Sequence, residues 1–212
     1  MCALSPSTGP CVAIDVDPPL FVGAVLLGGG SRRMGEDKAS LVLANGEMLG
    51  ARSVAALGDA GCSRIIGIGG TPELSSRLGI EHVPDKWPGQ GPLGALVTAL
   101  TASYPAVTVL LPCDLPLADA SVVQQLLQHL EAGNGEHHCA IPRIDGHRAF
   151  VTSVWSRDCL AALGRSFDSG GRSIRGALSG LDVLYFEPAA PRSFSDADTP
   201  EELHGLVDGE IG

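Results

Sequence analysis

The chain has 212 residues, a formal net charge of −10 and a hydrophobic fraction of 44%. This length suits one domain with a sizeable core, and so acidic a chain is a poor candidate for general nucleic-acid binding. No apolar run approaches the roughly 20 residues of a membrane-spanning helix, so we expect no membrane association. Residues 1–20 lack the pattern of a signal peptide. We interpret them as a flexible N-terminal tail and expect residues 21–208 to form one domain.

The 6 cysteines form no CxxC pair and fit no zinc motif or dense disulfide framework. Reduced thiols in a cytoplasmic protein explain them best. The consecutive residues His137, His138 and Cys139 invite a metal hypothesis. Successive residues of a strand point to opposite faces, however, so this cluster is a weak candidate for joint metal ligation.

In the first half of the chain, apolar strand-like runs alternate with helix-like segments. Such an alternation predicts βαβ units and a mainly parallel sheet, that is, an α/β fold. The predicted strands are residues 21–27, 64–70 and 106–116, and the predicted helices are residues 46–61, 91–104 and 120–133.

The second half is less regular. The pair Asp145–Gly146 separates two strand-like runs and predicts a hairpin or another antiparallel pair. We also expect helices near 155–163 and 173–181 and a late strand at 182–188. A last helix should begin with Thr199 as N-cap and Glu202 at the capping-box position.

The segment 26–40, LLGGGSRRMGEDKAS, follows a buried strand and precedes a helix. Ligands of open α/β sheets bind at the carboxyl ends of the strands, and the exposed amides of Gly28–Gly30 could form a nest for phosphate oxygens. The segment matches neither a Walker A motif nor a dinucleotide fingerprint. Arg33 and Lys38 would add positive charge. The alternative is a flexible surface loop.

A second candidate is Asp114 in LLPCDLP, at the end of a buried apolar strand. Mg²⁺ is often held by one or two carboxylates together with substrate phosphates, so Asp114 beside a phosphate loop predicts a magnesium site. The alternative is that Asp114 only caps the turn before Pro116.

Four segments together carry a resemblance to the molybdenum cofactor guanylyltransferases: LLGGGSRRMGEDKASL, VPDKWPGQGPLGAL, LLPCDLP and FSDADTPEEL. They occur in the family's order and span residues 22–207. The resemblance implies a single-domain, three-layer Rossmann-like nucleotidyltransferase fold with a mostly parallel mixed sheet.

The resemblance also implies roles for residues of the first segment. Leu26, Leu27 and Gly28 match the backbone that contacts GTP, and Gly29 completes the phosphate loop. Lys38 matches the lysine that binds the nucleotide phosphates. We expect Lys38 to lie on an exposed loop, so that its removal changes stability little.

Other residues matched by the resemblance lie outside the nucleotide backbone segment. Arg33 corresponds to the arginine near the leaving pyrophosphate, and Asp85 to an aspartate on the nucleoside side. Asp114 corresponds to the Mg²⁺ ligand that also touches GTP. Asp196 and Asp198 occupy positions of two asparagines of the family, and either is a candidate second metal ligand.

The implied reaction is transfer of GMP from GTP to the terminal phosphate of a molybdopterin cofactor, with Mg²⁺ and release of pyrophosphate. Transient contact with molybdoenzymes or cofactor-delivery proteins is a further expectation. Two alternatives remain open: a cytidylyltransferase or sugar-phosphate nucleotidyltransferase of the same fold, and a non-catalytic nucleotide- or pterin-binding module. Ala149 and Phe150 replace a Gln-Pro pair common in the family, on the acceptor side.

Overall fold

The computed structural model describes residues 21–28, 38–62, 64–197, 199, 202–203 and 205–206. The predicted tail, residues 1–20, lies outside this part of the chain. The predicted site residues Gly29, Arg33 and Asp198 also lie outside it.

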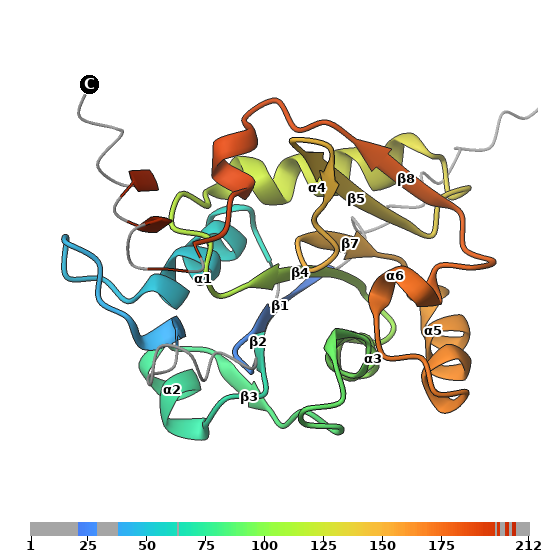
Figure 1. Ribbon diagram of the computed structural model, residues 1–212, viewed down its shortest axis with the longest axis horizontal. Coiled ribbons are helices and arrows are strands. Elements are labelled where there is room, and N and C mark those ends of the chain that lie inside the picture. Colours follow the sequence, from blue (N-terminus) through green and yellow to red (C-terminus); the bar gives the residue numbers. More distant parts are fainter. Residues whose placement is uncertain are drawn as a thin grey trace, which may run out of the picture.

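The described residues form one mixed sheet of eight strands in the order β3-β2-β1-β4-β7-β5-β6, with β8 also paired to β5 (Figure 1). Half of the sheet is parallel and consists of β1 (Phe21–Leu26), β2 (Arg64–Ile68), β3 (Glu81–Val83) and β4 (Val107–Pro112). The other strands are β5 (Cys139–Ile144), β6 (His147–Arg148), β7 (Ser153–Trp155) and β8 (Val183–Phe186).

The direction of the strands decides which ends share an edge of the sheet. β7 is antiparallel to both β4 and β5, whereas β8 is parallel to β5. Strands β5 and β8 therefore run in the same direction as β1 to β4. The carboxyl ends of all six lie at one edge, and ligands of open α/β sheets bind at such an edge.

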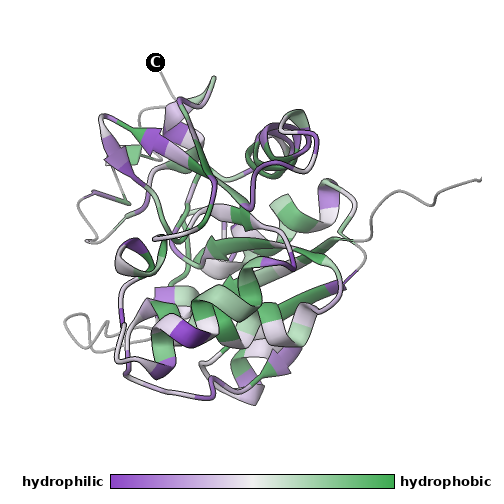
Figure 2. Cartoon of the chain, turned by 90° about the vertical axis from the view of Figure 1, so that its right-hand side faces the viewer, coloured by the Kyte–Doolittle hydropathy of each residue, from purple (hydrophilic) through white to green (hydrophobic). Residues whose placement is uncertain are grey.

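Helices cover both faces of the sheet and give three layers. The helix α4 (Ala120–Ala132) packs on one face of the sheet, and α3 (Pro92–Ser103) packs on the other. One apolar core joins the sheet to α4 and α1 (Leu49–Asp59), and a second joins its other face to α3, α5 (Cys159–Asp168) and α6 (Ile174–Ala177). Hydrophobic strands accordingly fill the middle of the molecule (Figure 2). No described helix is long and apolar enough to cross a membrane.

The α/β architecture with a mostly parallel sheet confirms the prediction from the sequence, although two elements had not been predicted. These are α2 (Pro72–Arg77) and β3, which are only 6 and 3 residues long. Segments of this length carry too little periodicity to be recognised. Local chemistry nevertheless starts α2, since the Thr71 side chain accepts a hydrogen bond from Leu74 N and proline occupies the first turn.

In the second half, the turn and the final cap are confirmed. Asp145 and Gly146 both have positive φ, 48° and 80°, as a tight hairpin turn between β5 and β6 requires. At the predicted final helix, Glu202 N donates to Thr199 Oγ1 at 3.2 Å, and Thr199 N donates to the Glu202 carboxylate at 3.1 Å. These reciprocal bonds form the predicted capping box.

Two helix boundaries differ from the prediction. The helix expected near 155–163 begins only at Cys159, because Trp155 pairs with Thr108 and Cys139 as the last residue of β7. The helix expected near 173–181 is a single turn, Ile174–Ala177, which starts at the Ser173 cap. Tertiary pairing and packing, and not helix propensity, set these limits.

Candidate active site at the carboxyl edge of the sheet

The strand register brings the ends of four strands, β1 to β4, to the same level. Leu26 pairs with both Ile68 and Pro112, and Ile68 pairs with Val83. Each strand therefore reaches its carboxyl end at the same height. The residues that follow these strands include Gly28, Gly70, Asp85 and Asp114, so three of the predicted site residues share one edge with Gly70.

Lys38 and Asp114 are in direct contact at this edge. Lys38 is the first residue of the short 3₁₀-helix η1 (Lys38–Ser40), and its Nζ donates to Asp114 Oδ2 at 3.0 Å. The same ammonium donates to the Ala197 carbonyl at 3.3 Å, and Ala197 N donates to the Asp114 carbonyl at 3.0 Å. Three segments distant in sequence thus meet at the predicted phosphate lysine and the predicted metal ligand.

The position of Lys38 corrects one expectation. We expected an exposed loop lysine, but the residue is only 9% exposed and belongs to the buried ion pair with Asp114. The 3₁₀ turn packs against α1, where Gly50 lies so close to Ala39 that a Cβ there would be 3.0 Å from the Ala39 Cβ. Lys38 therefore contributes to the fold as well as being placed in the candidate site.

Asp114 has an unusual electrostatic environment. Its burial raises the pKa of the carboxyl group above the ordinary range, the bond from Lys38 partly opposes this, and the nearby charge of Asp196 raises it further. A partly desolvated carboxylate with a second carboxylate close by is a favourable place for a divalent cation, because the cation would offset the charge of both. The Asp114–Asp196 pair is thus the acidic part of the site.

Those two carboxylates do not form a closed metal cage. Across the described part of the chain, no group of three or more His, Cys, Asp or Glu residues is arranged to hold a metal ion. A site with one or two carboxylates fits Mg²⁺ when substrate phosphates and water complete the shell. The donor set of Asp114 and Asp196 fits that ion.

The predicted backbone residues at the end of β1 lie in the site, but the structure changes how their amides are used. Leu27 N and Gly28 N both donate to the Ile68 carbonyl, at 3.0 and 3.2 Å. The Gly28 amide is therefore engaged by the sheet, whereas Gly29 and Gly30, the other residues of the expected nest, lie outside the described part of the chain. Leu26 is half-buried and Leu27 is buried, whereas Gly28 is exposed.

Two glycines that were not predicted as site residues, Gly69 and Gly70, lie against Leu27 and Gly28 at this edge. Gly69 and Gly70 follow β2 with φ values of 71° and 65°. A Cβ on Gly69 would come within 3.2 Å of Gly28 Cα, and a Cβ on Gly70 within 2.9 Å of Leu27 Cβ. The two strand ends approach too closely for side chains. The sequence signal was present, because both strands end in consecutive glycines.

Asp85 follows β3 and lies beside Gly69. Its Oδ1 accepts a hydrogen bond from Trp87 N at 3.0 Å and lies 3.4 Å from Thr98 Oγ1, whose single proton is shared with the Gly94 carbonyl at 3.0 Å. Thr98 is buried in α3 and had not been singled out from the sequence. The carboxylate is held by one of its two oxygens, so it is oriented by the neighbouring loop and α3.

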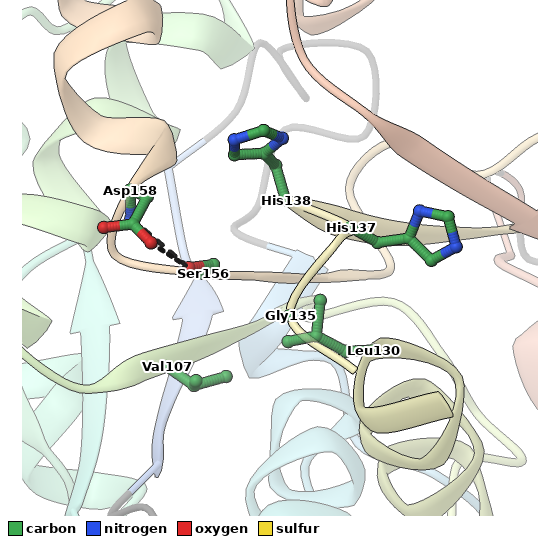
Figure 3. A pocket seen from close by; sticks show the side chains of 7 residues that line it. All are labelled: Val107, Leu130, Gly135, His137, His138, Ser156 and Asp158. Carbon is green, nitrogen blue, oxygen red and sulfur yellow. Dashed lines mark hydrogen bonds between the residues drawn. The ribbon is translucent and has the colours of Figure 1, made fainter. Parts of the chain in front are cut away.

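The two hollows identified in the described residues lie elsewhere. One, of about 220 Å³, is lined by seven residues that include Val107, His137 and Ser156 (Figure 3). The other, of about 480 Å³, includes His137 and Asp182. Val107 is the first residue of β4, so both hollows lie at the amino edge of the sheet, opposite Lys38 and Asp114.

The adjacent histidines are used differently from each other. His138 Nδ1 accepts a hydrogen bond from Asp182 N at 3.0 Å, which ties the start of β5 to the segment before β8. His137 lines both hollows, and in Figure 3 the two rings point in different directions. The structure therefore gives His138 a structural bond and does not join the two rings around one centre.

The chain is similar to a group of enzymes of known activity. Residues 23–182 match the family described as the MobA-like NTP transferase domain. A probable molybdenum cofactor guanylyltransferase of Pelotomaculum thermopropionicum is 32% identical over 144 residues, which cover 68% of this chain and 67% of that protein. The molybdenum cofactor guanylyltransferase of Syntrophotalea carbinolica is 31% identical over 178 residues, which cover 82% of this chain and 82% of that protein.

Solved structures share the fold. The molybdopterin-guanine dinucleotide biosynthesis protein A of Archaeoglobus fulgidus has a TM-score of 0.72 at 23% identity, with coverage of 90% of this chain and 98% of that one. A 4-diphosphocytidyl-2C-methyl-D-erythritol synthase of Anaerococcus prevotii has a TM-score of 0.69 at 9% identity, with coverage of 92% and 99%. The fold is thus common to enzymes that differ in nucleotide. On the family match and the sequence relatives, the chain belongs to the MobA-like NTP transferase family and is a nucleotidyltransferase.

Proposed function

We propose that this enzyme transfers GMP from GTP to the terminal phosphate of a molybdopterin-type cofactor. The sequence relatives named molybdenum cofactor guanylyltransferase support this acceptor and nucleotide. The observation that carries the proposal is the contact of Lys38 with Asp114 at the carboxyl edge of the sheet, which also carries Gly28 and Asp85. A cation and a carboxylate at that edge suit a triphosphate that enters together with a metal ion.

In the proposed reaction, an oxygen of the acceptor's terminal phosphate attacks the α-phosphorus of GTP. The bond from the α-phosphorus to the bridging oxygen breaks, and pyrophosphate leaves with that bonding pair. The chain needs no covalent intermediate, so catalysis consists of positioning and charge stabilisation. Asp114 would hold Mg²⁺, with Asp196 as a second candidate ligand, and the ion would supply Lewis acidity and charge neutralisation.

Lys38 changes partners in this scheme. Without substrate, its ammonium neutralises Asp114 and donates to Ala197. A divalent cation held by Asp114 would offset the charge of that carboxylate, and the Lys38 ammonium would then interact with the phosphate oxygens. Arg33 is proposed to add charge stabilisation to the departing pyrophosphate.

Asp85 is proposed to contact the guanine base. The hydrogen bonds that Asp85 forms within the described residues use its Oδ1, so its Oδ2 could accept a bond from the base. Guanine presents N–H donors that a carboxylate accepts. Asp85 would thereby favour GTP over nucleotides that lack such donors at that place.

The test begins with the four nucleoside triphosphates. GTP with Mg²⁺ should stabilise the protein most, by about 2.7 kcal/mol at a hundredfold excess over Kd. Asp85→Asn should reduce the preference for GTP, whereas Asp114→Asn should remove the part that depends on Mg²⁺. Labelled GTP should give pyrophosphate only when the pterin acceptor is present. Larger stabilisation by CTP would replace the proposal with cytidylyl transfer, and binding without turnover would indicate a binding module.

A further inference from the structure

A basic and aromatic surface lies on the strands that follow the nucleotide half of the sheet. Arg143 of β5 and Arg148 of β6 are directly opposite each other in the antiparallel register. The guanidinium carbons of both lie over the ring of Tyr185 in β8, at 5.0 and 4.5 Å from its centroid. We call these three residues the arginine–tyrosine surface.

This arrangement is costly in the absence of a ligand. Like charges that face each other across an antiparallel pair are destabilising. Within the described residues, neither guanidinium has a carboxylate at ion-pair distance, although the whole chain carries a net charge of −10. The Tyr185 ring offsets part of this repulsion through cation–π contacts. Two unpaired guanidiniums on one ring are instead well suited to an anionic ligand.

The surface is accessible. Arg148 is exposed, and Arg143 and Tyr185 are half-buried, so the ring is fixed by its surroundings while the cations remain open to solvent. Tyr185 packs against the core beneath the sheet, and its backbone pairs with Ile141. The arginine–tyrosine surface is therefore held on three strands and does not depend on a loop.

The arginine–tyrosine surface also lies at the carboxyl edge of the sheet, the same edge as Asp114. Arg143 is close to the carboxyl end of β5, and Tyr185 is the next-to-last residue of β8, and both strands run parallel to β4. Only β7 lies between β4 and β5. At about 4.8 Å between neighbouring strands, β5 lies roughly 10 Å from β4 and hence from the strand that carries Asp114.

A ligand that spans this distance would reach from Asp114 to the arginine–tyrosine surface. The phosphate that attacks GTP must lie beside Asp114, so a site about 10 Å farther along the edge would contact the other end of the acceptor. Guanidinium groups are planar cations, and two of them over one aromatic ring favour planar, electron-rich rings with negative charge. We propose that Arg143, Arg148 and Tyr185 form the subsite for the planar, anionic end of the acceptor. This inference rests on the proposed function, and it assigns the acceptor to particular residues.

The experiment uses pterin-6-carboxylate, a stable planar anion, as the probe. Its binding to the full chain is measured by fluorescence titration, without GTP, for the wild type, Arg143→Gln, Arg148→Gln and the double variant. Each single variant should weaken binding by about tenfold, and the double variant by more. Added salt should weaken binding to the wild type. Arg148 is exposed, so Arg148→Gln should retain the wild-type melting temperature.

Two control variants separate the site from general charge. Arg77→Gln removes an exposed arginine from the last turn of α2, at the β3 side of the sheet, and should bind the probe as the wild type does. Tyr185→Phe keeps the ring and should also bind normally. Equal losses in Arg77→Gln and Arg148→Gln, or no detectable binding to the wild type, would overturn the subsite.

The same variants distinguish the subsite from the proposed function. In turnover assays, Arg148→Gln should raise KM for the pterin acceptor while leaving GTP-induced stabilisation unchanged. If GTP fails to stabilise any variant but the probe still binds in an arginine-dependent manner, guanylyl transfer is wrong and the subsite stands. If KM for GTP rises as much as KM for the acceptor, the arginines do not belong to an acceptor subsite.

Discussion

Lys38 and Asp114 lie 76 residues apart in the sequence, and the Lys38 ammonium donates to the Asp114 carboxylate at 3.0 Å. Both side chains are largely buried, with exposed fractions of 11% and 16%. The proposed phosphate ligand and the proposed metal ligand are therefore one electrostatic unit before any substrate binds. Substitutions at either residue will affect both folding and activity, and experiments must separate the two effects.

Breaking this ion pair should destabilise the protein. Lys38→Met or Asp114→Asn leaves a poorly solvated polar or charged group without its partner, at a cost of about 3–5 kcal/mol. The double variant should cost less than the sum of the single variants, because it leaves no unpaired charge. Urea denaturation of the four proteins measures the coupling. The exposed Arg64–Glu81 pair is the control, and Glu81→Gln should cost less than about 1 kcal/mol. Equal costs at the two pairs would contradict the burial argument.

Binding of Mg²⁺ in the presence of GTP should weaken at a higher pH than for an ordinary aspartate. Burial raises the pKa of Asp114 above its reference value of 3.8, so the carboxyl becomes protonated earlier as the pH falls. The contribution of this group to the free energy of unfolding changes with pH in the opposite direction from Mg²⁺ binding. It is fully present below the unfolded-state pKa and is lost as the pH rises through the higher folded-state pKa.

Magnesium titrations of GTP-bound protein, followed by thermal shift from about pH 7 to about pH 4.5, measure this effect. Magnesium titrations of free GTP at each pH correct for protonation of GTP itself, whose terminal phosphate titrates at about pH 6 by analogy with other phosphates. A pH dependence that is the same in the wild type and in Asp114→Asn would remove Asp114 from the metal site.

Gly70→Ala should destabilise the protein more than Gly79→Ala. The two glycines have similar φ values, 65° and 70°, so alanine incurs the same backbone strain of about 1–2 kcal/mol at both. A Cβ at Gly70 would also lie 2.9 Å from Leu27 Cβ, whereas a Cβ at Gly79 has no neighbour within 4 Å. The additional overpacking should cost about 1–3 kcal/mol. Thermal melts of both variants measure the difference, and similar melting temperatures would show that the strand ends can separate freely.

Arg33→Ala should slow GTP turnover by about 10²–10³, the usual effect of losing one donor aimed at developing charge. Arg32→Ala is the matched control, because Arg32 is the sequence neighbour of Arg33 and carries the same charge. Both residues lie outside the described part of the chain, so the roles remain predictions from the sequence. Steady-state kinetics with saturating Mg²⁺ measure the two rates. Equal losses at Arg32 and Arg33 would indicate a diffuse basic patch.

The sequence by itself determined the α/β fold, and it predicted a candidate site at the carboxyl edge of the sheet. Buried strands that run into glycines, and an aspartate after an apolar strand, are local patterns, and they can be recognised without knowing how distant segments pair. The motif of residues 26–41 determined the family in the same way. The sequence did not indicate α2 or β3, because these elements are too short to show a hydrophobic periodicity.

Tertiary structure alone decided how these residues contact one another. The burial of Lys38, its bonds to Asp114 and Ala197, and the influence of Asp196 on Asp114 depend on η1, the end of β4 and the C-terminal segment meeting in space. Desolvation depends on all atoms around a group, so no local pattern reveals it. The meeting of Arg143 and Arg148 over Tyr185 likewise required the register of β5 with both β6 and β8, because strand pairing brings together side chains that sequence spacing keeps apart.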